Sequence, residues 1–219
     1  IRAYSWVEGD RPADIVDGAL AAAARGFTAI KMLGTEELQY LDSHAKIDLL
    51  LARVQAVREA IGPDFGIAVD FHGRVHRPMA KPLVKALEPY RLMFIEEPVL
   101  SEHTEALKEI AHHCSTPIAL GERLYSRWDF KAILAQGYVD IIQPDFQKVG
   151  GLAEAQKVAN LAQTFYIPVA PHCVVSPIGM MATCHAFASF PNFLACEWHW
   201  INFPDYWTHW VKEGQIIEN

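Results

Sequence analysis

A carboxylate and an imidazole follow the most strand-like sequence in the first third of the chain. Residues 66–69 are small or β-branched and apolar, and Asp70 and His72 come directly after them. Residues two places apart along an extended chain point to the same side, so both side chains should face one point beyond the strand end. An acid and an ionisable ring placed there could hold a metal ion or move a proton, or they could simply belong to a turn.

The same arrangement recurs in the next two strand-like runs. Residues 92–95 lead to Glu96 and residues 117–121 lead to Glu122, at steps of 26 residues from Asp70, about one strand-helix-strand period. Three carboxylates at one sheet edge would repel each other unless a cation neutralised them, and all-oxygen ligands favour Mg²⁺. The spacing therefore predicts a metal site at Asp70, Glu96 and Glu122. Unrelated, salt-bridged strand ends are the alternative.

Three further predicted strands also end in polar residues, Asp145, His172 and Glu197, at steps of 23, 27 and 25 residues. His172 could act as a general base toward a proton next to a substrate carboxylate, with Asp145 holding the imidazole tautomer. His72 could protonate a leaving group, and Glu197 could hydrogen-bond the product of proton removal. As alternatives, Asp145 could cap the helix that starts near Gly150, and Glu197 could pair with an arginine.

Strand-like and helix-like segments alternate along the whole chain. The predicted strands cover residues 1–7, 28–32, 66–70, 92–96, 117–122, 139–143, 167–171 and 193–197. The predicted helices cover residues 11–25, 45–61, 81–87, 101–110, 126–134, 150–162 and 177–187. This alternation predicts an α/β fold, a TIM-type (β/α)7β barrel with its site at the C-terminal strand ends. A doubly wound open sheet is the alternative, but no glycine-rich turn follows the first strand.

Composition narrows the class of protein. The chain has 219 residues, is 51% hydrophobic and carries a formal net charge of −7. It has no basic run and no apolar run of about 18 residues, so neither nucleic acid nor a membrane is an expected partner. The four cysteines lack CxxC spacing, which indicates reduced thiols and a cytoplasmic location. Cys173, beside His172, is expected to be a packed cysteine and not a nucleophile. The tail at 203–219 carries Trp207 and Trp210 without an evident packing partner.

Nine short stretches resemble the enolase superfamily, at residues 4–6, 70–74, 78–81, 88–91, 94–99, 121–123, 143–145, 150–151 and 170–173. The most specific of them is Asp-Phe-His-Gly-Arg at 70–74. Together they cover nearly the whole chain and are most similar to the mandelate racemase-like subgroup. Within that subgroup the chain looks most like the acid-sugar dehydratases, in particular those that act on galactonate.

The resemblance implies a reaction as well as a fold. It implies Mg²⁺-dependent loss of water from an aldonate, through α-proton abstraction and a metal-stabilised enediolate, to give a 2-keto-3-deoxy acid. Its implied site comprises the metal ligands Asp70, Glu96 and Glu122, the base dyad His172–Asp145, the acid His72, the stabilising acid Glu197 and the substrate-binding residues Lys31 and Arg123. Dehydration of gluconate or arabinonate, epimerisation, and a non-catalytic barrel fragment are the alternatives.

The chain departs from the family pattern in two ways. Many subgroup members carry Lys-x-Lys on the second strand, whereas Leu33 takes the second position here, which argues against racemisation by two opposed bases. The N-terminal α+β capping domain of the family is not recognisable. A complete barrel runs to about 250 residues, so we expect residues 1–219 to be a single, incomplete barrel domain that lacks the cap and the C-terminal end. A small acid sugar and a homo-oligomeric partner are expected.

Overall fold

A parallel sheet forms the centre of the molecule. The computed structural model describes residues 1–35, 38–199 and 204–214. Within these residues the strands are β1 (Ala3–Val7), β2 (Ala29–Leu33), β3 (Gly66–Asp70), β4 (Phe94–Glu96), β5 (Ile118–Leu120), β6 (Ile141–Ile142) and β7 (Cys196–Trp198). They pair in the order β6-β5-β4-β3-β2-β1-β7, and every pairing is parallel. Their C-terminal ends therefore meet at the same edge.

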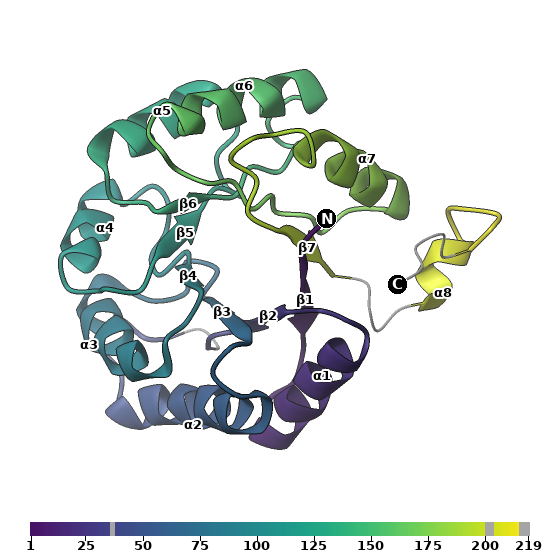
Figure 1. Ribbon diagram of the computed structural model, residues 1–219. Coiled ribbons are helices and arrows are strands. Elements are labelled where there is room, and N and C mark those ends of the chain that lie inside the picture. Colours follow the sequence, from purple (N-terminus) through teal and green to yellow (C-terminus); the bar gives the residue numbers. More distant parts are fainter. Residues whose placement is uncertain (36–37, 200–203, 215–219) are drawn as a thin grey trace.

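Helices follow the strands along the chain and lie outside the curved sheet (Figure 1). They are α1 (Pro12–Ala24), α2 (His44–Ile61), α3 (Arg77–Leu87), α4 (Thr104–Ala111), α5 (Arg127–Gln136), α6 (Leu152–Gln163), α7 (Pro177–Phe187) and α8 (Pro204–Thr208). The predicted α/β alternation is confirmed as a parallel α/β partial barrel. Among the described helices, not one combines the length and apolar composition that a bilayer span requires.

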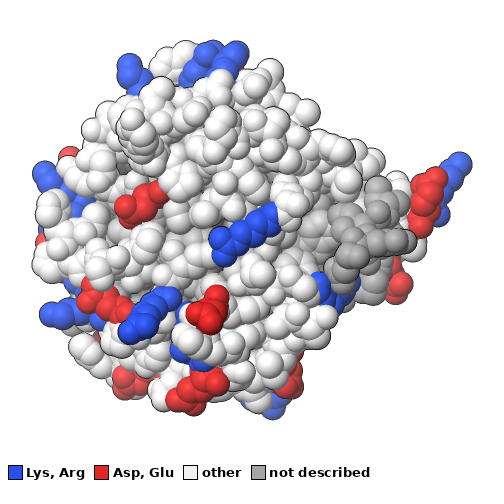
Figure 2. All heavy atoms as spheres, viewed as in Figure 1, with Lys and Arg blue, Asp and Glu red and all other residues white. Residues whose placement is uncertain are grey.

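Both faces of the sheet are buried, which explains the nearly continuous apolar runs in its strands. Large aliphatic side chains fill the layer between the strands and the helices. The inner face is lined by Tyr4, Ala29, Ala68, Phe94, Ala119, Ile141, Ala170 and Ala195. Five of these eight are alanines, so the strands can curve closely around their common axis. On the face shown in Figure 2, charged side chains of both signs are scattered and do not gather into one patch.

Prolines explain two of the differences between the predicted and the observed elements. Residues 167–171 do not form a strand; only Val169 makes bridges, to Ile142 and to Phe193. Pro168 and Pro171 have no backbone N–H to donate, so the ladder does not extend from Val169. Helix α3 begins at Arg77 and not at residue 81, because a proline fits the first turn of a helix.

The helix predicted over residues 126–134 is observed as α5. Ser126 and Asp129 form a capping box at its start, and Gly137 ends it in the left-handed conformation. The tail has a packing partner that the sequence did not indicate. Trp207 is fully buried and stacks on Trp198, with ring centroids 5.8 Å apart. Of the predicted tail, residues 203 and 215–219 lie outside the described residues.

Candidate active site

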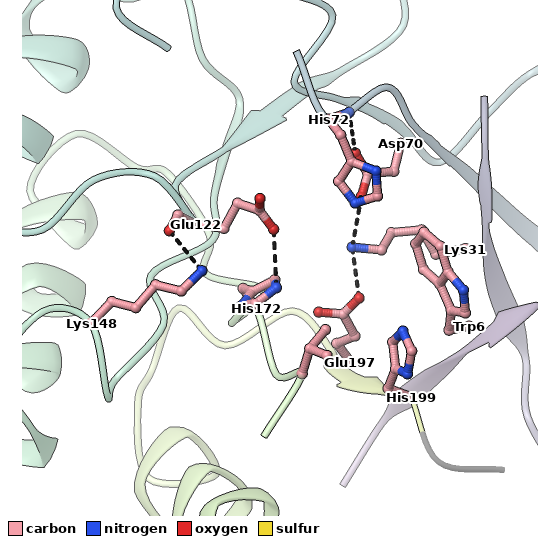
Figure 3. A pocket seen from close by; sticks show the side chains of 10 residues that line it. Trp6, Lys31, Asp70, His72, Glu122, Lys148, His172, Glu197 and His199 are labelled. Carbon is pink, nitrogen blue, oxygen red and sulfur yellow. Dashed lines mark hydrogen bonds and ion pairs between the residues drawn. The ribbon is translucent and has the colours of Figure 1, made fainter. Parts of the chain in front are cut away.

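A cavity of about 400 Å³ opens beside the C-terminal strand ends (Figure 3). Its lining residues are Trp6, Lys31, Asp70, His72, Glu122, Lys148, His172, Val174, Glu197 and His199. Most of them come from the ends of strands or the loops that follow, where the sheet topology brings distant segments together. The predicted residues Asp145 and Glu96 are buried directly behind this wall.

Lys31 lies at the meeting point of several carboxylates. Its Nζ is 2.7 Å from Glu96 Oε2, 2.7 Å from Glu197 Oε1 and 3.5 Å from Asp70 Oδ2. Gln143 also donates a hydrogen bond to Glu96, at 2.6 Å. Burial opposes the charge on Lys31, but Glu197 and Glu96 outweigh it and raise the pKa of Lys31 well above its ordinary value. Lys31 is therefore a permanent internal cation, 1% exposed.

The carboxylates around Lys31 differ from each other. Burial, followed by the charge of Asp70, raises the pKa of Glu96 well above its ordinary value. Burial also disfavours the charge on Glu197, but Lys31 and His172 together lower the pKa of that carboxyl. Glu197 additionally accepts a hydrogen bond of 2.8 Å from the backbone N–H of Cys173. As it lies, Glu197 is an acceptor and needs a proton before it can donate one. Its partner is a lysine and not the arginine of the alternative interpretation.

His172 lies between two other carboxylates. Its Nδ1 is 2.8 Å from Asp145 Oδ2, and its Nε2 is 3.0 Å from Glu122 Oε2. Burial favours the neutral ring, but Asp145 and Glu122 outweigh it and raise the pKa of His172 to about 10. Burial likewise raises the pKa of Glu122, but the hydrogen bond from His172 dominates and the net value is about 2. Asp145 orients the ring as predicted but does not cap α6, which has no side-chain cap; its Oδ1 instead accepts the backbone N–H of Gln147 at 2.9 Å, in the turn before that helix.

His72 faces the cavity from the opposite side. Its Nε2 lies 3.0 Å from Asp70 Oδ2, and its backbone N–H donates to Asp70 Oδ1 at 2.8 Å. About a quarter of its side chain is exposed (27%). The ring also lies near Trp6, with centroids 5.9 Å apart. The structure thus places two carboxylate-bound histidines on the wall of one cavity.

A family model described as enolase C-terminal domain-like matches residues 14–218. The chain belongs to this family. It is 48% identical over 185 residues to a D-galactonate dehydratase from Ralstonia pickettii (strain 12J), a match that covers 84% of the chain and 48% of that relative. The enolase-family chain thus spans about half the length of the curated relative it matches.

Solved structures agree with the family assignment. A mandelate racemase/muconate lactonizing enzyme-like protein from Rubrobacter xylanophilus superposes with a TM-score of 0.92 at 36% identity, over 100% of this chain and 62% of that one. A 3,6-anhydro-D-galactonate cycloisomerase from Zobellia galactanivorans superposes with a TM-score of 0.81 at 30% identity, over 91% of this chain and 54% of that one. The predicted resemblance to the enolase superfamily is confirmed.

Enolase-superfamily sites generally use Mg²⁺, and the donor types of this enolase-family chain suit that ion. Asp70, Glu96 and Glu122 offer only oxygen atoms from three neighbouring strands. Glu96 Oε1 is buried and has no hydrogen-bond partner among the described residues. A bound cation would supply the partner that this oxygen lacks.

The side chains of this enolase-family chain do not meet at one point as the spacing predicted. Asp70 and Glu96 form ion pairs with Lys31, whereas Glu122 forms an ion pair with His172. As they lie, no three described histidine, cysteine or carboxylate side chains are grouped to hold a metal ion.

Sequence reasoning placed one substrate contact differently. It also missed four cavity residues, which are Trp6, Lys148, Val174 and His199. Arg123 does not line the cavity, because its guanidinium is held by other residues. His199 lines it and stacks on Trp6, with ring centroids 5.4 Å apart. His199 follows Glu197 by two places, as His72 follows Asp70. The same spacing could therefore have identified His199 from the sequence. Lys148 lies in a loop and donates to the Glu122 carbonyl at 3.1 Å; no periodic pattern marks it.

Proposed function

We propose that this chain is the catalytic part of a Mg²⁺-dependent acid-sugar dehydratase that converts an aldonate, such as galactonate, to a 2-keto-3-deoxy acid. The observation that carries the proposal is the pair His172 and His72, which face one cavity from two sides, each bound to a carboxylate. The similarity to a D-galactonate dehydratase supports the substrate class. The same proposal includes the closed (β/α)7β barrel, supported by the Val169 bridges that link Ile142 to Phe193.

In this proposal His172 removes the proton from the carbon next to the substrate carboxylate. Asp145 accepts the Nδ1–H, so the ring is oriented with Nε2 toward the cavity. His172 can accept a proton only after Nε2 has lost its own proton and its contact with Glu122. Mg²⁺, which Asp70, Glu96 and Glu122 would hold, supplies positive charge where the substrate carboxylate becomes more negative.

His72 acts as the acid on the opposite side. Its imidazole donates a proton to the 3-hydroxyl as the C3–O bond breaks, so that one water leaves. The electrons of the broken C2–H bond form the C2–C3 double bond, and the resulting enol tautomerises to the 2-keto acid. Glu197, once protonated, would hydrogen-bond the electron-rich intermediate.

Lys31 disfavours the epimerase alternative. An epimerase of this type needs a second base opposite His172, and Lys31 is the amine that the second strand brings to the cavity. That amine is held by Glu96 and Glu197, and its raised pKa keeps it protonated. Dehydration, which needs one base and one acid, fits the site better. A homo-oligomeric state and a cytoplasmic location stay predictions.

The test uses a panel of acid sugars including galactonate, gluconate and arabinonate. The purified protein is assayed for 2-keto-3-deoxy acid with Mg²⁺ and with EDTA, and for α-proton exchange in D₂O. We expect His72→Asn to exchange the α-proton without forming product, and His172→Asn to lose both, each by about 10²–10⁴-fold.

His112→Asn is the matched control, because His112 is exposed at the end of α4. It should retain both activities. If His72→Asn loses exchange as fully as His172→Asn while both variants keep their melting temperatures, the assigned roles are wrong. Full activity in excess EDTA would contradict the metal requirement.

A further inference from the structure

Two non-glycine residues beside the cavity adopt a left-handed backbone. His72 has a φ of +49° and Glu97 a φ of +39°. Side chains with a Cβ rarely occupy this region, and they stay there only when surrounding contacts hold them. His72 lies two residues after the end of β3, and Glu97 directly follows the end of β4. The contacts that hold the His72 backbone therefore determine where its imidazole points.

Arg123 supplies one of these contacts from the end of the next strand. Its Nη2 donates to the His72 carbonyl at 3.0 Å, and its Nε donates to Glu97 Oε2 at 2.7 Å. Glu97 also binds the loop of His72 directly, because its backbone carbonyl accepts the N–H of Gly73 at 3.0 Å. Ser101 donates to the other Glu97 oxygen, at 3.1 Å. The loops after three consecutive strands are thus joined around the His72 peptide.

We propose that Glu97 and Arg123, here called the clamp, are positioning residues that hold His72 in its proton-donating orientation. This inference rests on the proposed function insofar as His72 is the acid of the reaction. Glu97 is fully buried and Arg123 does not line the cavity, so neither residue is placed to touch substrate. The planar guanidinium suits this task, because it donates in two fixed directions at once.

Arg123 has a second carboxylate neighbour that must be separated from this role. Its Nε lies 3.5 Å from Glu122 Oε1, so Arg123 could instead act by orienting a proposed metal ligand. The contact with Glu97 is shorter by 0.8 Å and has hydrogen-bond geometry. The clamp therefore predicts an effect on His72 that does not pass through Mg²⁺ binding.

The first test is kinetic. Arg123→Lys keeps the charge and loses the forked donor, and we expect dehydration to fall by about 10²-fold while α-proton exchange falls less than about threefold. The double variant with His72→Asn should be no slower than His72→Asn alone, because both changes remove the same step. Arg127→Lys, at an arginine that pairs with Glu154 at 2.8 Å on the outer helices, is the matched control and should change nothing.

The second test needs no turnover. The His72 imidazole signal in a ¹H–¹³C NMR spectrum, assigned by its loss in His72→Asn, should shift in Arg123→Lys and in Glu97→Gln but not in Arg127→Lys. Mg²⁺ affinity, measured by calorimetry, should stay within about threefold. Glu97→Gln keeps an oxygen acceptor for the guanidinium, so it serves if Arg123→Lys does not fold.

Three results separate the possibilities. An unmoved His72 signal in both clamp variants overturns the inference. A large loss of Mg²⁺ affinity in Arg123→Lys that parallels the loss of dehydration also overturns it, because Arg123 then acts through Glu122. If the wild type dehydrates no acid sugar, the proposed function fails, while the NMR comparison still supports or overturns the clamp.

Discussion

Two buried cations divide the strand-end carboxylates, and they do so in different ways. Lys31 is enclosed by Glu96, Glu197 and Asp70 and is 1% exposed. His172 lies between two carboxylates with 9% of its side chain exposed on the cavity wall. The comparison indicates that the ion pairs of Lys31 stabilise the fold, whereas His172, at the cavity wall, is placed to exchange a proton with a substrate.

Removing the enclosed cation should have the largest effect on stability. Lys31→Met leaves buried carboxylates without their counter-ion, and breaking a buried pair costs about 3–5 kcal/mol. We expect the free energy of unfolding in urea, measured at pH 7 with EDTA, to fall by about this amount. Lys148→Met, at a lysine of the cavity wall, should cost less than about 1 kcal/mol. Equal losses in the two variants would contradict the distinction between the clusters.

Changing the His172 cluster should instead affect activity. Asp145→Asn removes the charge that orients the ring, so we expect dehydration and α-proton exchange to fall together by about 10–10²-fold, less than the loss in His172→Asn. Both rates are measured on the same preparation, next to a melting curve. Unfolding of Asp145→Asn at the temperature of the assay would mean that Asp145 supports the fold and not the ring.

The two clusters should also differ in their response to pH. The pKa of folded His172, about 10, lies above its ordinary value of 6.5, so the stabilisation is complete below pH 6.5 and is lost as pH rises toward 10. The pKa of Glu122, about 2, lies below its ordinary 4.5, so its stabilisation is complete above pH 4.5 and is lost toward pH 2. The pair should therefore stabilise the fold most between pH 4.5 and 6.5.

Urea unfolding in EDTA at several pH values measures this window. The difference in unfolding free energy between wild type and His172→Gln should shrink from pH 6.5 to pH 10. The difference between wild type and Lys31→Met should stay nearly constant over the same range, because Lys31 keeps its proton. Parallel pH dependence of the two differences would show that the histidine is not the titrating group.

Surface charge should matter least. Glu109 on α4 pairs with Arg77 at 2.6 Å and with Lys81, both on α3, and these pairs lower the pKa of Glu109 to about 2. Solvent screens such pairs, so Glu109→Gln should shift the urea midpoint less than any variant above, and 1 M NaCl should reduce the shift further. A midpoint shift as large as that of Lys31→Met would show that the exposed ion pairs of Glu109 stabilise the fold as much as the buried ion pairs of Lys31.

The sequence predicted that β3 ends at Asp70 and β4 at Glu96, because each of these strands is a short apolar run that ends at its first charged residue. It also placed Glu122 beside them, two residues after the end of the neighbouring strand β5. It did not predict how side chains rotate beyond the strand ends. Whether the Glu122 side chain points to a metal position or to His172 depends on which cation lies nearer. The spacing of residues along the sequence does not indicate that distance.

Other contacts also depend on the three-dimensional arrangement. Lys31 was assigned to substrate binding from the resemblance; it lines the cavity, and three carboxylates offset its desolvation there. No packing partner for Trp207 was evident from the sequence. Its contact with Trp198 joins β7 to helix α8, which lies beyond the repeating strand-helix pattern. Arg123 was assigned to substrate binding from the resemblance. Its actual contacts depend on the left-handed turns at His72 and Glu97, which sequence patterns do not indicate.

The position of β1 between β2 and β7 has a consequence for synthesis of the protein. Ala3 pairs with Cys196, so one side of β1 stays unpaired until nearly 200 further residues have left the ribosome. At about 5–20 residues per second this takes about 10–40 s. During that time the exposed edge of an apolar strand is open to pairing with other nascent chains. We therefore expect the exposed edge of β1 to need protection from such pairing until β7 has been made.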